Sequence, residues 1–186
     1  TLNMPINLPE TGEVKGLEFD IQTNLRHWPV PGFFKGVVLG FNYALLSSKI
    51  GIRDFQTRTI SLPVPPFFRT ERVPVDREIS VPGQADHLAN LSLGYDIGGF
   101  SARVSMFHQS ESLRDIGVLE EQDGYDDAFT RWDLSLRQRI FSRWDAYFTV
   151  SNLSNTRDRR YVFRNDRPTR LESFGRTADL GLQFRL

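Results

Sequence analysis

The sequence predicts an all-β, antiparallel, up-and-down segment of a transmembrane β-barrel, and three observations support this fold class. Hydrophobic residues recur with a period of two in seven segments of the chain. Each segment is close in length to a tilted membrane crossing and longer than the usual soluble strand of about 5–6 residues. Short and long connections alternate between the segments, as they do at the two ends of an outer-membrane barrel.

The seven expected strands follow one another without a convincing helix between them. In the first, Leu17, Phe19 and Ile21 alternate with Glu18 and Asp20. The expected strands cover residues 16–25, 36–45, 89–96, 100–107, 131–140, 144–151 and 177–186. Their polar faces, rich in glycine, hydroxyl, amide and charged groups, suit a wet lumen. Their other faces suit lipid, with Trp and Tyr near the strand ends as in an aromatic girdle.

The connections between these strands indicate which end of the sheet faces outward. The short ones are residues 26–32, 97–99 and 140–143, and the long ones are residues 50–86, 110–127 and 152–173. If Leu186 lies on the periplasmic side, every short turn lies there too and every long loop lies outside. A soluble antiparallel sandwich also alternates with a period of two, but its strands are shorter and such long connections are uncommon in it.

The composition argues against several functions. Lys+Arg and Asp+Glu are both 23, so the zero formal charge gives no support to nucleic-acid binding. The chain has no cysteine, which excludes a disulfide framework, a Cys-ligated zinc site and a thiol nucleophile. His27, His87 and His108 lie on different segments without metal-ligand spacing, and no nucleophile or phosphate-binding motif occurs. We therefore expect no metal, no cofactor and no enzymatic activity.

Six stretches that span nearly the whole chain carry a family resemblance. They are GEVKGLEFDIQ (12–22), VVLGFNYALLSS (37–48), VPGQADHLANLSLGYDIGGFSARVS (81–105), RWDLSLRQRI (131–140), FTVSNLSNTRDRRYV (148–162) and GRTADLGLQFRL (175–186). In this order they resemble the C-terminal part of the barrel of a TonB-dependent outer-membrane receptor. The resemblance implies a bacterial outer-membrane transporter with about 22 strands around an N-terminal plug. Its energy would come through TonB, and its cargo would be a siderophore, cobalamin, haem or glycan.

Residues 1–186 are therefore expected to form the C-terminal portion of such a barrel, without the plug and the earlier strands. Residues 1–10 have neither the basic nor the apolar region of a signal peptide. Seven strands are too few to close a barrel of that width, and open sheet edges are not viable in lipid. The TonB complex would engage the missing N-terminal region. Two alternatives remain: a passive porin, adhesin or secretion barrel, and a soluble β-sandwich binding module.

The last expected strand resembles the signal that the barrel-assembly machinery reads. Gly181, Phe184 and Leu186 match its pattern of a glycine, an aromatic residue and a terminal hydrophobic residue. The chain departs from the pattern at Leu186, where Phe is commoner, and at Leu180, which is usually polar. An exposed strand of this kind can pair with an edge of the machinery by β-augmentation. The alternative is a lipid-facing strand end without a further role.

The longest connection contains one candidate for ligand contact. Pro65 and Pro66 precede Phe67, Phe68 and Arg69. Exposed aromatic rings at this position could stack on a sugar or on an aromatic chelator. The alternative is a loop that folds over its own rim.

A second candidate is a basic cluster in the last long connection, where Arg160, Tyr161 and Arg164 are the proposed ligand contacts. The arginines could bind cargo or the phosphates of lipopolysaccharide at the outer surface. Asp158 and Asp166 lie among them, so a solvated loop with internal salt bridges is the alternative. The remaining members of the cluster are Arg157, Arg159, Phe163, Arg167 and Arg170.

Overall fold

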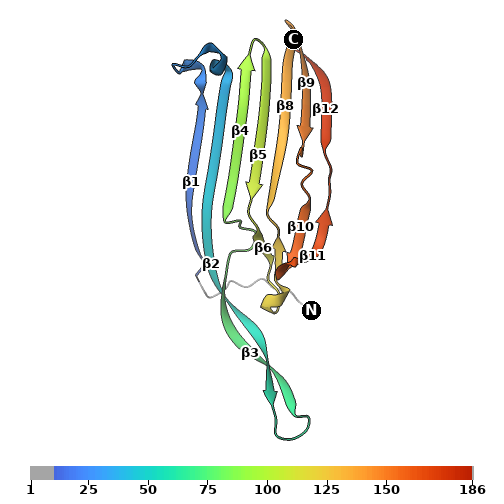
Figure 1. Ribbon diagram of the computed structural model, residues 1–186. Coiled ribbons are helices and arrows are strands. Elements are labelled where there is room, and N and C mark those ends of the chain that lie inside the picture. The colour runs from blue at the N-terminus through green and yellow to red at the C-terminus, as the bar shows by residue number, and fades with distance from the viewer. Residues whose placement is uncertain (1–10, 186) are drawn as a thin grey trace.

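The computed structural model describes residues 11–185 and consists of one long antiparallel sheet with a smaller sheet beyond one of its ends (Figure 1). The long sheet has the order β1-β2-β4-β5-β8-β9-β12, and β3 pairs with β2. Its strands are β1 (Glu13–Asn24), β2 (Val37–Ser61), β3 (Phe68–Ile79), β4 (His87–Ile97), β5 (Phe100–Gln109), β8 (Phe129–Phe141), β9 (Trp144–Ser151) and β12 (Thr177–Phe184).

All seven strands expected from the alternation are present, and the all-β fold class is confirmed. They are β1, the first part of β2, β4, β5, β8, β9 and β12, and each pairs antiparallel with its neighbour. β1 and β12 are the two edges of the sheet, so the described part of the chain is an open piece of wall. The helices in this part are the short 3-10 turns η1 (Leu25–His27), η2 (Gly32–Gly36) and η3 (Glu120–Gln122).

Among residues 11–185, no helix combines the length and the apolar character that a membrane crossing requires.

The strand register gathers the apolar side chains of all seven strands on one face of the sheet, which we call the apolar face. One row crosses the whole sheet and consists of Thr23, Leu39, Leu93, Val104, Leu134, Val150 and Ala178. The row beside it contains Ile21, Phe41, Leu91, Met106 and Trp132. Leu180 on this face is 80% exposed. A contiguous exposed apolar surface of this extent is typical of a wall that contacts lipid.

The opposite face, which we call the polar face, is built from the alternate residues. One of its rows consists of Gln22, Gly40, Ser92, Ser105 and Asp133. Because these side chains are small or polar, they leave a hollow of about 400 Å³ in the middle of the wall, beside Asn42 and Asn90. This surface is suited to a water-filled lumen.

The two ends of the sheet differ in the way the connection lengths predict (Figure 1). One end, the turn end, carries η1 and η2, the β4–β5 and β8–β9 turns, and the end of β12. Exposed aromatic rings gather there: Trp28, Phe33, Phe34, Phe141, Trp144 and Phe184. The rings of Trp144 and Phe184 are 5.1 Å apart. The two tryptophans, Trp28 and Trp144, lie near strand ends as expected, and the gathering of rings at this end is what an aromatic girdle at one membrane interface requires.

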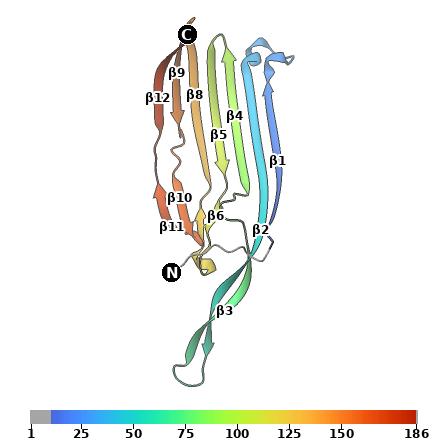
Figure 2. The same ribbon diagram turned by 180° about the vertical axis from the view of Figure 1, so that it is seen from behind.

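At the opposite end, the loop end, the long connections differ from expectation because they contain strands of their own. β2 continues to Ser61 and pairs with β3 along its full second half, and this β2–β3 ribbon projects well beyond the wall (Figures 1 and 2). A second sheet has the order β11-β10-β7-β6. It consists of β6 (Ser112–Asp115), β7 (Gly124–Asp126), β10 (Asp158–Val162) and β11 (Arg164–Glu172). The alternation did not reveal these strands because both of their faces are largely polar.

Candidate functional site

The tip of the β2–β3 ribbon presents aromatic and basic side chains to solvent. Phe67 and Phe68 are 60% and 61% exposed. The backbone of Phe67 is left-handed, with φ of 62°, and its amide donates to the Val64 carbonyl at 2.9 Å, which closes the turn. Arg69 lies beside them and forms an exposed ion pair with Glu71 at 3.4 Å. The tip projects away from the wall and does not fold over its rim (Figure 2).

The basic cluster of the last connection consists largely of arginines paired with nearby acids. The pairs are Arg159–Asp127 at 3.1 Å, Arg160–Asp126 at 2.9 Å, Arg164–Asp166 at 3.4 Å, and Arg170–Glu172. These four arginines therefore form the internal salt bridges that the alternative interpretation of the cluster expects. Arg164 remains well exposed on β11.

The side chain of Tyr161, on β10, is buried and is not available at the surface of the second sheet. It is 4% exposed, its ring stacks on Tyr125 at 5.2 Å, and its hydroxyl donates to the Glu111 carboxylate at 2.7 Å. Burial, reinforced by the Glu111 carboxylate, raises the pKa of Tyr161 far above its usual range. Of the three residues proposed in this cluster, Arg160 and Arg164 reach the surface, while Tyr161 stabilises the sheet beneath them.

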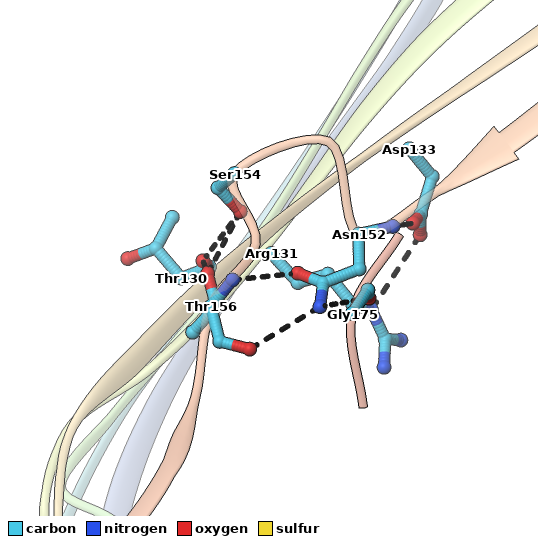
Figure 3. A network of polar contacts seen from close by, with 7 residues as sticks. All are labelled: Thr130, Arg131, Asp133, Asn152, Ser154, Thr156 and Gly175. Atoms are coloured by element: carbon cyan, nitrogen blue, oxygen red, sulfur yellow. Dashed lines mark hydrogen bonds and ion pairs between the residues drawn. The ribbon is translucent and has the colours of Figure 1, made fainter. Parts of the chain in front are cut away.

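Asn152 fastens the start of the β9–β10 connection to two neighbouring strands (Figure 3). Its backbone is left-handed, with φ of 58°, a conformation that asparagine tolerates well. Its backbone N–H donates to Asp133 Oδ1 on β8 at 2.8 Å. Its side-chain Nδ2 donates at the same distance to the carbonyl of Gly175, just before β12. Its Oδ1 accepts from the Thr156 amide at 2.8 Å, and the Thr156 hydroxyl donates to the Thr130 carbonyl. The sequence alone assigned no role to Asn152.

Asp145 on β9 contacts β8 and the residue that follows β12, at the turn end of the polar face. Its side chain is 2% exposed, and its Oδ2 lies 2.5 Å from Nη2 of both Arg137 and Arg185. The Nε of Arg139 is 3.8 Å from the other oxygen. A cavity of about 630 Å³ opens beside this cluster. Its basic lining residues are Arg26, Lys35, Arg137, Arg139 and Arg185.

We expect Asp145→Asn to lower the urea midpoint of the folded barrel, because the arginines around this carboxylate would lose their shared counter-charge. The midpoint can be measured from the heat-modifiable folded band on a gel. Asp76→Asn is the control, since Asp76 is 86% exposed and 3.6 Å from Arg53. Exposed pairs of this kind contribute little, so its midpoint should equal that of the wild type. Equal midpoints for both variants would contradict a stabilising role for Asp145.

The residues of the proposed assembly signal lie on or beyond the edge strand β12. Gly181 faces Tyr147 on β9, and a Cβ added at Gly181 would lie 2.4 Å from the ring of Tyr147. Phe184 pairs with Trp144 at the turn end of the apolar face. Leu186 lies outside the described residues. The edge position leaves β12 available to another strand, and the close Tyr147 contact explains why residue 181 has no side chain.

Two of the histidines, His87 and His108, take part in separate hydrogen bonds. His87 is bonded to the Tyr43 hydroxyl at 2.7 Å, and His108 to the Thr130 hydroxyl at 2.8 Å. Within residues 11–185, no group of three or more His, Asp or Glu side chains is arranged to hold a metal ion.

The open wall with one apolar and one polar face defines the class of the protein, a piece of a transmembrane β-barrel. Residues 2–153 match the family described as "TonB dependent receptor-like, beta-barrel". The chain belongs to this family of outer-membrane receptors and transporters.

A known structure agrees with this fold. The crystal structure of the siderophore receptor PiuA from Acinetobacter baumannii is similar to the chain, with a TM-score of 0.64 and 16% sequence identity. The similarity covers 94% of this chain and 22% of that receptor, so the chain spans about a fifth of the receptor's length. At this identity the likeness shows the fold alone. No curated protein sequence matches the chain.

Proposed function

We propose that residues 1–186 are the C-terminal portion of the barrel of a TonB-energised receptor, which imports a scarce ligand across the bacterial outer membrane. The observation that carries this proposal is the wall, in which one apolar row crosses all seven strands. The chain that forms this wall belongs to the TonB-dependent receptor family. The complete barrel, of about 22 strands, would also contain the plug and the earlier strands. The cargo is a small molecule or a glycan.

The two faces and the two ends of the wall support distinct partners. Lipid and lipopolysaccharide would cover the apolar face, and the lumen would lie against the polar face. The barrel-assembly machinery would pair with β12 through Gly181, Phe184 and Leu186, and the TonB complex would engage the N-terminal region of the whole receptor. Nucleic acid is not an expected partner, because the formal charge of the chain is zero.

TonB dependence tests the proposed function against the passive alternatives. Uptake of candidate cargo should require the whole receptor and should be lost in an otherwise identical strain without TonB. A porin or adhesin barrel would not respond to the loss of TonB. Fractionation of the same cells should recover the protein in the outer membrane, and recovery as a detergent-free, folded, soluble monomer would contradict the membrane assignment.

The tip of the ribbon is the best candidate for the first contact with cargo. Phe67 and Phe68 offer two exposed rings, and Arg69 adds a cation within the same turn. This combination suits a ligand with a flat or sugar-like surface and an anionic group. Arg160 and Arg164 offer further cationic contacts on the second sheet.

We expect the triple substitution of Phe67, Phe68 and Arg69 by alanine to weaken cargo capture by about tenfold or more, because aromatic and arginine anchors dominate binding energy. The measurement is growth of cells that depend on the receptor for the scarce ligand. Alanine at Thr59 and Thr70, an exposed cross-strand pair on the same ribbon, is the control and should leave growth unchanged. Normal growth of the triple variant, at equal expression, would exclude the tip as a cargo contact.

A further inference from the structure

We propose that Arg77 and Asp123 form a latch that fastens the β2–β3 ribbon to the second sheet and thereby sets the direction in which the ribbon tip points. The latch governs the mobility of the ribbon and does not depend on what the tip binds.

The latch is a two-pronged ion pair near the root of the ribbon. Arg77 lies on β3, and its Nη1 and Nη2 donate to the two carboxylate oxygens of Asp123 at 2.5 and 3.2 Å. The Nε of Arg77 lies 3.1 Å from the carboxylate of Asp54, which is on β2. Paired forks of this kind fix orientation as well as distance, because both nitrogen atoms must meet their oxygen atoms at once.

Asp123 is itself fixed by two other parts of the loop end. Its Oδ1 accepts from the amide of Gly117, in the connection between β6 and β7, at 2.9 Å. Its carbonyl accepts from the amide of Phe163, in the turn between β10 and β11, also at 2.9 Å. One residue therefore connects the ribbon, through Arg77, to the β6–β7 connection and to the β10–β11 turn, which both lie at the end of the second sheet where β7 begins.

Burial separates this pair from the ordinary surface pairs of the ribbon. The side chains of Arg77, Asp54 and Asp123 are 14%, 10% and 2% exposed. The Asp123 carboxylate raises the pKa of the Arg77 guanidinium, which is consistent with a persistent pair. Removing Arg77 would leave the buried carboxylates of Asp54 and Asp123 without their shared counter-charge, and an uncompensated buried charge is costly.

The direction of the ribbon depends on this contact because little else packs around the ribbon root. A cavity of about 280 Å³ and another of about 710 Å³ lie beside the root, and Arg77 lines both. The packing between the ribbon and the second sheet is therefore interrupted on two sides of the ion pair. A two-stranded ribbon is by itself only marginally stable in water, so it needs an anchor of this kind to keep one direction.

A distance measurement on the whole receptor in outer-membrane vesicles tests the latch. Cysteines introduced at Thr59 on the ribbon and Thr169 on the second sheet can be spin-labelled, and this chain has no native cysteine. In the wild type we expect a single narrow distance distribution between the labels. Arg77→Gln should widen it by about twofold or more, because the ribbon is released to local motion. An unchanged distribution in Arg77→Gln would overturn the proposal.

Two further variants make the result specific. Arg53→Gln removes an ion pair from the same ribbon, but Arg53 and Asp76 are exposed, so this control should keep the narrow distribution. The triple variant Asp54→Asn/Arg77→Gln/Asp123→Asn neutralises all three buried groups, so it leaves no unpaired charge among them and covers the case in which the single variant fails to fold. A wide distribution in the triple variant supports the latch, and a narrow one contradicts it. Widening by Arg53→Gln of the same size would also contradict it.

Discussion

Removal of residues 184–186 from the whole receptor is expected to abolish its insertion into the outer membrane. The deletion removes Phe184, which pairs with Trp144 at the end of the edge strand β12, together with the terminal Leu186 of the proposed signal. It also removes Arg185, one of the two arginines closest to Asp145. The assembly machinery would lose the strand end on which it pairs, and the finished barrel would lose an ion pair that joins the chain end to β9.

The two losses can be separated by single substitutions. Arg185→Ala removes the contact to Asp145 but keeps the aromatic and terminal hydrophobic residues, so it should insert and show only reduced stability. Phe184→Ala should reduce insertion itself. The measurement is the amount of heat-modifiable protein in isolated outer membranes. Normal insertion of the deletion variant would show that these residues are a lipid-facing strand end and not an assembly signal.

Arginine at the centre of the apolar face is expected to destabilise the barrel by about 2–4 kcal/mol, because a charge near the bilayer midplane must leave water. Val104 is the test position, since it lies in the middle of β5 between Leu93 and Leu134. The stability of the whole receptor, refolded into lipid vesicles, can be measured by urea titration. The expected result for Val104→Arg is a clear decrease in the free energy of unfolding.

The adjacent residue provides a matched control for this variant. Ser105 points to the polar face, between Ser92 and Asp133, and borders the mid-wall hollow. An arginine there meets water and the Asp133 carboxylate, so Ser105→Arg should change stability by much less. If Ser105→Arg were the more damaging of the two, the lipid and lumen faces would be the reverse of those proposed.

The strands of the wall were predictable because each carries its own signal. Leu17, Phe19 and Ile21 alternate with polar residues within a single strand, and the lipid and the lumen impose the same alternation on every other strand. The family resemblance of the chain could be stated from short stretches for the same reason. The exposed tip at Phe67 and Phe68 was also accessible, since two prolines and two aromatic residues mark a turn in a long connection.

The loop end was not predictable in the same way. Most positions of the β2–β3 ribbon are exposed, and in β3 the alternating apolar residues are only Val73, Val75 and Ile79. So short an alternation does not distinguish the ribbon from a loop. The sequence predicts Tyr161 as a possible ligand contact, but its neighbours in the fold, Tyr125 and Glu111, bury it. Burial depends on residues that are distant in the sequence, and one sequence does not reveal their positions.

The sequence by itself determined the wall: its seven strands, the apolar face that we propose meets lipid, and the end at which the long connections lie. These properties are local, because apolar and polar residues alternate with a period of two within each strand. Only the tertiary structure determined which charges meet. Arg77 and Asp123 are 46 residues apart, and Arg185 and Asp145 are 40 residues apart. Such pairs form because the fold buries both partners together, and the chain distance between them gives no indication of it.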